Sequence, residues 1–189
     1  MRRRLATVSD CPVFDGPFLF LRHGETETNR LGLTAGMTDV ALNDTGRRQA
    51  MEAAAALAGR GIDAIYSSPL QRAFLTAQCV AQSLRLPIVT IAELAERNWG
   101  VHEGQPRETR SRAGTPEGGE GIDAFTRRTL AGLARIPAGQ LPLIVAHSGT
   151  FRVLCAEFAI ETAGQVENCR PLRFCPPGPG SPYWRVAAL

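Results

Sequence analysis

An arginine and a histidine stand side by side directly after a short apolar run. We predict that Phe18–Leu21 forms a buried strand, and Arg22 and His23 follow it. Open α/β sheets place their ligand crevices at the C-terminal ends of such strands. An arginine guanidinium binds phosphate oxygens in pairs, while a neutral histidine nitrogen can attack phosphorus and become phosphorylated. The pair therefore predicts phosphoryl chemistry, with His23 as the candidate nucleophile.

Three further polar blocks follow along the chain in a fixed order. They are Ser67–Ala73, Leu94–Arg97 and Val145–Gly149. Together with the Arg-His-Gly triplet at 22–24, this order resembles the histidine phosphatase superfamily, which has the phosphoglycerate-mutase-like fold. The resemblance covers most of the chain. It implies an α/β fold with three layers (α/β/α) around a mostly parallel, doubly wound sheet.

The same resemblance implies roles for the residues around the phosphoryl group. His23 would be the nucleophile, and Arg22 and Arg72 would bind the non-bridging phosphoryl oxygens. Asn29 would donate a neutral hydrogen bond to the same group. His147 follows a predicted strand just as His23 does, so we expect it at the same edge of the sheet. Its implied role is to stabilise negative charge on the transferring phosphoryl group.

Two carboxylates are candidates for the acid that protonates the leaving oxygen. Glu96 matches the acidic position of the family, and the same carboxylate could then activate water to hydrolyse phosphohistidine. Glu25 is the competing candidate because it lies close to the nucleophile in the sequence. We favour Glu96 on the motif.

The remaining residues of the predicted site would shape the pocket. Ser148, where the family more often has glycine, would add a donor at the start of a helix. Gly36 lies in a block that contacts the ligand in the family, and Trp99 occupies an aromatic position beside the pocket. His102 has no family role, and we interpret it as a residue of the rim.

The elements that must position these side chains alternate between strands and helices. This alternation predicts a mostly parallel sheet covered on both faces. We expect residues 1–16 to be an irregular N-terminal extension and 17–189 to be a single domain with a short cap region around 103–121. Strands are predicted at 18–21, 62–66, 87–91 and 141–146, helices at 47–59, 70–84, 122–136 and 151–160, and a closing pair of strands at 172–174 and 184–188.

The length and composition agree with a single compact enzyme. The 189 residues carry a formal net charge of +3, which comes from arginine alone because the chain has no lysine. The arginines are spread along the chain, so we expect no nucleic-acid partner. No apolar stretch approaches the ~18 to 20 residues that span a bilayer. We therefore expect no membrane partner and a cytoplasmic location. Because the resemblance already gives His23 and His147 other roles and no acidic cluster accompanies them, we expect no metal, and we expect no cofactor. The oligomeric state stays open.

The predicted cap region is much shorter than the corresponding region of cofactor-dependent phosphoglycerate mutases. A short cap leaves water free to reach a phosphohistidine, which favours hydrolysis over transfer to a second substrate position. The leading hypothesis is a metal-independent phosphatase that hydrolyses a small phosphorylated metabolite through phosphohistidine on His23. The alternatives are a phosphoglycerate-type mutase, a protein phosphohistidine phosphatase and a non-catalytic module that binds a phosphorylated ligand.

Overall fold

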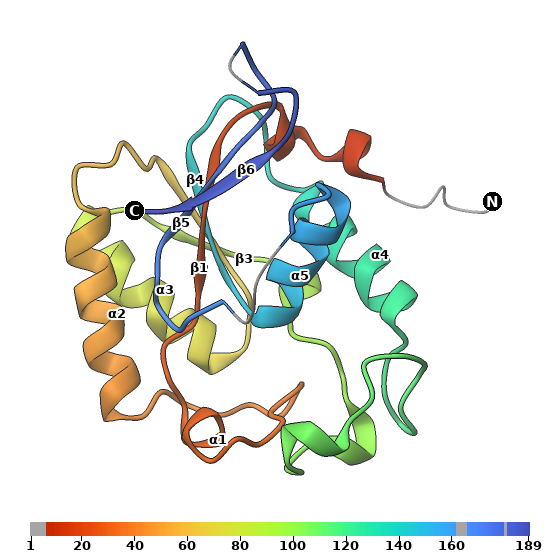
Figure 1. The fold of residues 1–189 in the computed structure, drawn as a ribbon. Coiled ribbons are helices and arrows are strands. Elements are labelled where there is room, and N and C mark those ends of the chain that lie inside the picture. Colours follow the sequence, from red (N-terminus) through yellow and green to blue (C-terminus); the bar gives the residue numbers. More distant parts are fainter. Residues whose placement is uncertain (1–6, 162–165, 180) are drawn as a thin grey trace.

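The computed structural model describes residues 7–161, 166–179 and 181–189. They form a six-stranded sheet between two layers of helices, with α2 and α3 on one face and α4 and α5 on the other (Figure 1). The strands are β1 (Phe18–Arg22), β2 (Ala64–Ser67), β3 (Ile88–Thr90), β4 (Pro142–Ala146), β5 (Leu172–Cys175) and β6 (Arg185–Ala188). The helices are α1 (Glu27–Arg30), α2 (Asp44–Leu57), α3 (Gln71–Leu84), α4 (Ile122–Leu133) and α5 (Ser148–Glu157).

The sheet is parallel at its centre and antiparallel at one edge. Its strand order is β3-β2-β4-β1-β5-β6, and β1, β2, β3 and β4 pair in parallel. The hairpin of β5 and β6 adds to β1 in antiparallel fashion. The predicted three-layer α/β/α fold with a mostly parallel sheet is confirmed, and so is the closing pair of strands.

Strand β1 divides its side chains between two hydrophobic cores. Phe18 and Phe20 pack in the core that α4 and α5 cover, while Leu19 and Leu21 pack against α2 and α3. All four side chains are buried because successive residues of a strand point to opposite faces of the sheet. A strand buried on both faces reads as a continuous apolar run, which explains why the sequence signal was clear.

The structure differs from the sequence prediction at the N-terminus and at several helix ends. Residues Val8–Asp10 and Pro12–Asp15, part of the predicted irregular extension, form two 3-10 turns. Val13 and Phe14 from this segment are buried in the core, so it is part of the folded domain, whereas residues 1–6 lie outside the described part. Helix α2 begins three residues earlier than predicted because Asn43 accepts a hydrogen bond from the amide of Gly46 and caps it.

Among the helices of the described residues, none has the length and apolar character needed to cross a membrane.

Candidate active site

Strands β1 and β4 bring the two predicted histidines together at one edge of the sheet. Arg22 pairs with Ala146 at the end of the parallel ladder, and His23 and His147 are the next residues of each strand. The two imidazole rings are 5.2 Å apart between centroids. Both side chains are buried. The expected meeting of the two histidines is therefore present, and it follows from strand register alone.

The ring of His23 is held in the tautomer that a nucleophile requires. Its Nδ1 lies 2.7 Å from the carbonyl oxygen of Gly24, which can only accept, so Nδ1 carries the proton. Nε2 is then the unprotonated nitrogen. Burial, together with the positive charges of Arg72 and Arg22, holds the pKa of His23 well below its usual value. A neutral imidazole with a free lone pair on Nε2 is the nucleophilic form.

His147 lies beside His23 and is not among the residues that line the pocket. Its Nε2 lies 2.7 Å from the hydroxyl of Ser68, and its buried Nδ1 has no hydrogen-bond partner among the described residues. Burial and the charge of Arg72 lower its pKa well below the usual value. The structure thus brings a neutral His147 next to His23, with one ring nitrogen uncommitted.

Two buried arginines, Arg22 and Arg72, lie near His23. Arg22 donates from Nη1 to the carbonyl oxygen of Val166 at 2.7 Å. Arg72 donates from Nη1 to Thr38 O at 2.9 Å and from Nη2 to Gly36 O at 2.7 Å. These bonds fix both guanidinium planes, yet Nε of each arginine lacks a hydrogen-bond partner in the described part of the chain. Burial lowers the pKa of Arg22 to about 10, so it stays cationic at neutral pH.

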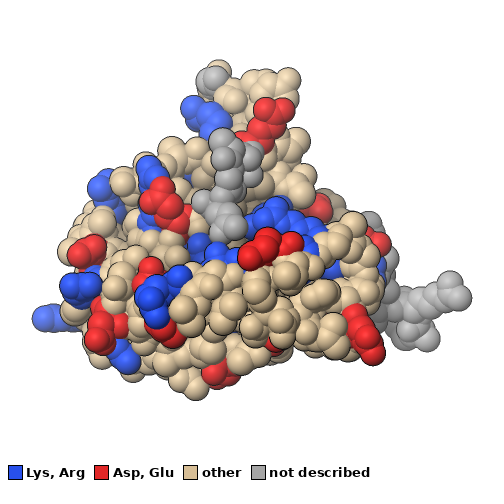
Figure 2. Space-filling view, turned by 60° about the horizontal axis from the view of Figure 1, so that its bottom comes forward, with Lys and Arg blue, Asp and Glu red and all other residues tan. Residues whose placement is uncertain are grey.

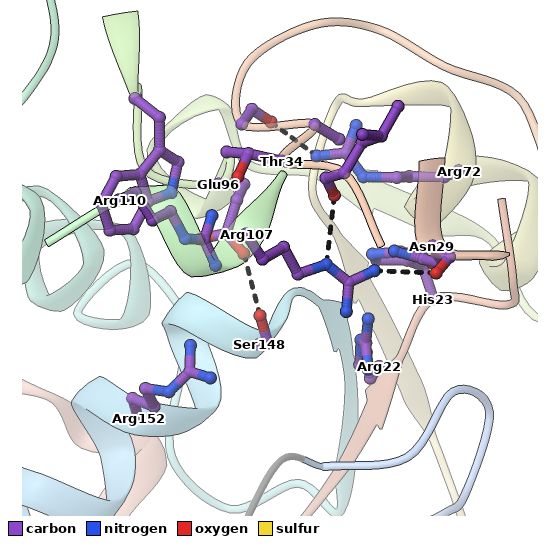
Figure 3. Close-up of a pocket in the computed structure, with 14 residues that line it drawn as sticks. Arg22, His23, Asn29, Thr34, Arg72, Glu96, Arg107, Arg110, Ser148 and Arg152 are labelled. Atoms are coloured by element: carbon purple, nitrogen blue, oxygen red, sulfur yellow. Dashed lines mark hydrogen bonds between the residues drawn. The ribbon is translucent and has the colours of Figure 1, made fainter. Parts of the chain in front are cut away.

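Asn29 and the predicted pocket residues lie where the sequence places them. The Oδ1 of Asn29 accepts hydrogen bonds from the amide of Thr26 and from Asn168 Nδ2, which leaves Nδ2 as the group able to donate to a ligand. Gly36, Trp99 and Ser148 also line the pocket, as do Arg22, His23, Arg72 and Glu96 (Figure 3).

The carboxylate of Glu96 is anchored at the pocket by the start of α5. Its Oε2 accepts hydrogen bonds from the amide of Gly149 at 3.1 Å and from the Ser148 hydroxyl at 3.4 Å. Its Oε1 accepts from the amide of Arg97 at 2.9 Å. The competing carboxylate, Glu25, accepts instead from Asn43 Nδ2 at 2.8 Å and does not line the pocket. The geometry favours Glu96 over Glu25 as the group that could exchange a proton with a ligand.

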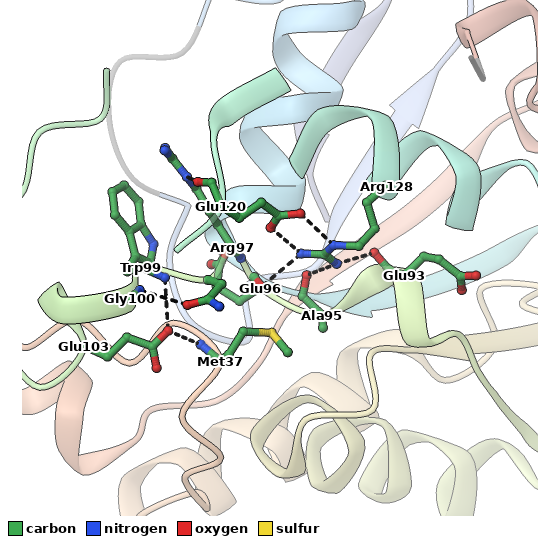
Figure 4. Close-up of polar contacts among 11 residues, drawn as sticks. Met37, Glu93, Ala95, Glu96, Arg97, Trp99, Gly100, Glu103, Glu120 and Arg128 are labelled. Carbon is green, nitrogen blue, oxygen red and sulfur yellow. Dashed lines mark hydrogen bonds and ion pairs between the residues drawn. The ribbon is translucent and has the colours of Figure 1, made fainter. Parts of the chain in front are cut away.

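Two charged side chains outside the pocket hold its walls. Arg128 of α4 donates to the carbonyl oxygens of Glu93, Ala95 and Glu96 and forms an ion pair with Glu120 at 2.8 Å (Figure 4). It therefore fixes the backbone that carries the catalytic carboxylate candidate.

Glu103 supports the opposite wall. Its carboxylate accepts hydrogen bonds from the amides of Met37, Thr38 and Trp99 and from the hydroxyl of Thr38. The segment it holds supplies the two carbonyl groups that bind Arg72. Glu103 therefore supports the position of Arg72 through this loop.

Sequence reasoning missed three arginines of the pocket wall. Arg107 and Arg110 come from the cap region, and Arg152 comes from α5. Arg107 donates to Leu33 O and to Asn29 O, whereas Arg110 lies over the ring of Trp99, 4.1 Å from its centroid. Arg152 follows Ser148 by four residues on one helix, so the i,i+4 spacing could have placed it at the site. Arg107 begins the short 3-10 turn Arg107–Thr109 and Arg110 follows it, so no helix or strand periodicity predicts their direction. His102 does not line the pocket.

Comparison with known proteins agrees with the fold and the site. A profile of the histidine phosphatase superfamily (branch 1) matches residues 18–170. An uncharacterized phosphatase of Bacillus subtilis, PhoE, is 36% identical over 146 residues, which cover 74% of this chain and 75% of that protein. Phosphoglycerate mutase-like protein 4 of Arabidopsis thaliana is 35% identical over 168 residues, covering 78% of this chain and 73% of that one.

Some relatives are much longer. The chain spans only 42% of a bifunctional protein of Mycobacterium tuberculosis, to which it is 37% identical over 153 residues covering 72% of this chain.

Solved structures give the same result. The mycobacterial glucosyl-3-phosphoglycerate phosphatase in complex with VO3 superposes with a TM-score of 0.75 and 26% identity over 92% of this chain and 98% of that one. The alpha-ribazole phosphatase of Shigella flexneri gives a TM-score of 0.76 and 25% identity over 92% and 95% of the two chains. The chain belongs to the histidine phosphatase superfamily. It is an enzyme of the phosphatase type, a hydrolase of phosphoric monoesters.

Proposed function

We propose that this enzyme hydrolyses a small phosphorylated metabolite without a metal ion, by way of a phosphohistidine on His23. One observation carries the proposal. Three buried nitrogens around His23 have no hydrogen-bond partner among the described residues: Nε of Arg22, Nε of Arg72 and Nδ1 of His147. Buried polar groups are almost always paired, because an unpaired one costs about 1 to 3 kcal/mol. A phosphoryl group beside His23 would supply acceptor oxygens for the two arginine nitrogens, whose side chains line the pocket.

The proposed reaction has two steps. In the first, Nε2 of His23 forms a bond to phosphorus, the bond from phosphorus to the ester oxygen breaks, and Glu96 gives its proton to the leaving oxygen. In the second, a water molecule attacks phosphorus and passes a proton to Glu96 while the bond between nitrogen and phosphorus breaks. Inorganic phosphate leaves, and both His23 and Glu96 return to their starting states.

The class of substrate is inferred from the site and from the relatives. The pocket is lined mostly by polar and charged groups, and His23 lies at its buried end. Two structural relatives are named as phosphatases of glucosyl-3-phosphoglycerate and of alpha-ribazole phosphate, which are small phosphorylated molecules. Both observations support a phosphomonoester of small size.

The direct test is chemical trapping of the intermediate. We expect His23→Ala to lower kcat by at least about 10³-fold while thermal unfolding stays near that of the wild type, because a pocket residue rather than a core packing residue is truncated. Labelled substrate quenched without acid should leave phosphate on His23 in the wild type. His102→Ala is the matched control and should retain activity. More than a per cent or so of wild-type activity in His23→Ala would refute the covalent route.

A second test concerns metal ions. Arg22 and Arg72 place positive charge where a metal ion acts in other phosphatases, so activity should survive dialysis against EDTA. Vanadate should inhibit by mimicking the five-coordinate phosphoryl group. Loss of activity in EDTA that a divalent ion restores would overturn the metal-independent route.

The name of one relative makes a mutase the second candidate function. Given 3-phosphoglycerate and a catalytic amount of the bisphosphate, a mutase would form 2-phosphoglycerate rapidly. We expect release of inorganic phosphate, if any reaction occurs, and no isomerisation.

A further inference from the structure

A second cavity, which we call the side chamber, adjoins the phosphate pocket. Its apolar wall is formed by Ile122, Phe125, Val153 and Ala156. Its volume is about 210 Å³. An apolar cavity of about 150 Å³ is large enough to bind benzene, so the side chamber can accept one six-membered ring.

The side chamber opens directly onto the proposed proton donor. Glu96 and Ser148 line both the chamber and the phosphate pocket. With phosphorus bound at His23, the ester oxygen must lie beside Glu96 to receive its proton. The group attached to that oxygen then extends past Glu96, and the side chamber is the space next to it.

Three arginines around this space have no anionic or hydrogen-bonding partner in the described part of the chain, although Arg110 lies over the ring of Trp99. Arg110, Arg112 and Arg152 all line the side chamber, and within the described residues none of them makes a hydrogen bond or ion pair through its side chain. In contrast, Arg22, Arg72 and Arg107 each donate to backbone carbonyl groups.

The unpaired arginines repel one another. Burial and the positive charges of Arg152, Arg107 and Arg112, against the opposing effect of Glu96, together lower the pKa of Arg110 to about 10. Figure 3 shows Arg110 and Arg152 on the side of the pocket where Glu96 and Ser148 meet. In the view onto this end of the molecule, arginine atoms gather near the middle of the face (Figure 2).

A single phosphate does not account for this charge. Among the described residues that line the pocket and the side chamber, Glu96 is the one carboxylate. A phosphoryl group bound at Arg22 and Arg72 leaves Arg110 and Arg152 unneutralised at the entrance to an apolar space. A second anionic group next to an apolar body would match both features.

We propose that the side chamber binds the leaving group of the substrate, and that this leaving group is an apolar ring or branched chain carrying its own negative charge, held by Arg110 and Arg152. The inference rests on the phosphatase function proposed above, and it narrows the substrate class to phosphomonoesters with an anionic, largely apolar leaving group.

The test compares esters that differ only in that charge. We would measure kcat/KM for 4-carboxyphenyl and 3-carboxyphenyl phosphate and for the corresponding neutral carbamoylphenyl phosphates, which have similar shape. At least one carboxylate ester should be preferred over its amide by roughly tenfold or more, as expected for one charge-assisted contact. The preference should weaken as salt concentration rises.

Variants then assign the preference to the side chamber. Arg152→Met and Arg110→Met should each lower the ratio of carboxylate to amide, and the double variant should bring it close to one. Ala156→Phe fills the chamber from an exposed helix position, so it should lower kcat/KM for the phenyl esters relative to glycerol 2-phosphate, which has no ring. Arg127→Met, on the exposed side of α4, is the matched charge control and should keep the wild-type ratio.

The outcomes separate this inference from the proposed function. Equal rates for the carboxylates and amides in the wild type, or a preference that survives in the double variant of Arg110 and Arg152, would overturn the anionic subsite while leaving the phosphatase intact. Phenyl esters unaffected by Ala156→Phe would overturn the placement of the leaving group. A wild-type enzyme that releases no phosphate from any of these esters would refute the proposed function and, with it, this inference.

Discussion

A side chain at position 149 would overlap the carboxylate of Glu96. A Cβ atom built on Gly149 would clash with Oε1 of Glu96 and would lie 2.8 Å from Cζ of Phe125. At the same time the amide of Gly149 donates a hydrogen bond to that carboxylate. The glycine therefore provides both the donor that holds Glu96 and the space in which it lies.

This relationship predicts that Gly149→Ala lowers activity by displacing Glu96. General acid catalysis is worth about 10² to 10⁴-fold, so we expect kcat for alkyl phosphates to fall by about 10²-fold. Esters with a good leaving group, such as p-nitrophenyl phosphate, should be affected less. Gly16→Ala, where the added methyl would meet nothing within 4 Å, is the control. An unchanged kcat in Gly149→Ala would show that the Glu96 position is not required.

Arg128 is predicted to act on Glu96 through the backbone. Replacing it with methionine leaves the carbonyl groups of Glu93, Ala95 and Glu96 without this donor, and each part-buried hydrogen bond lost costs about 0.5 to 1.5 kcal/mol. We expect Arg128→Met to lower the urea midpoint and to slow alkyl phosphates more than p-nitrophenyl phosphate. The neighbouring Arg127→Met should change neither quantity. Equal slowing of both ester types would reduce Arg128 to a purely structural role.

Glu103 is predicted to act on phosphate binding through Arg72. In Glu103→Gln one oxygen becomes an NH2 group that faces amide donors, so the loop carrying Gly36 O and Thr38 O loses part of its support. We expect vanadate affinity and kcat/KM to fall together by about tenfold, since one charge-assisted hydrogen bond contributes on this scale. The exposed Glu108→Gln serves as the control. Wild-type vanadate affinity in Glu103→Gln would contradict the prediction.

The neutral histidines predict how stability depends on pH. The pKa of His23 is depressed in the folded state, so the unfolded chain, with a histidine pKa near 6.5, binds protons first as the pH falls. The stability from keeping His23 neutral is therefore complete above about pH 6.5 and is lost as the pH falls below it, at up to about 1.4 kcal/mol per pH unit. Between about pH 7.5 and about pH 5.5, His23→Asn should lose roughly 1 kcal/mol less than the wild type in urea unfolding. Identical losses would mean that His23 is protonated in the native state.

Features fixed by local pattern were predictable from the sequence. The apolar run of β1 and its following Arg22 and His23 could be placed because a doubly buried strand is unbroken in hydrophobicity. The carboxyl ends of parallel strands meet at one edge of the sheet, so His147 was expected at the same edge as His23. The register of β1 with β4 then places the two residues side by side. The roles of these residues, and of Glu96, came from the order of motifs rather than from any pattern of hydrophobicity.

Features fixed by contacts between distant segments were not predictable. The 3-10 turn Pro12–Asp15 could not be predicted because its sequence has no periodic pattern. Its position is set by the packing of Phe14 in the hydrophobic core. Arg107 and Arg110 lie in and directly after a 3-10 turn of three residues, which is too short for a sequence period to predict their direction. Their direction is set by Leu33 O, Asn29 O and the ring of Trp99, which lie elsewhere in the chain.

The bonds of Arg107 have a kinetic consequence. The segment that carries it is joined to the loop after α1 by the amides of Thr34, Gly104 and Arg107 and by the arginine side chain itself. At this part of the pocket mouth the two segments are therefore held together by several hydrogen bonds. A ligand that enters here meets a preformed, positively charged opening. We therefore expect the association rate constant of an anionic ligand to depend on diffusion and ionic strength rather than on closure of a loop.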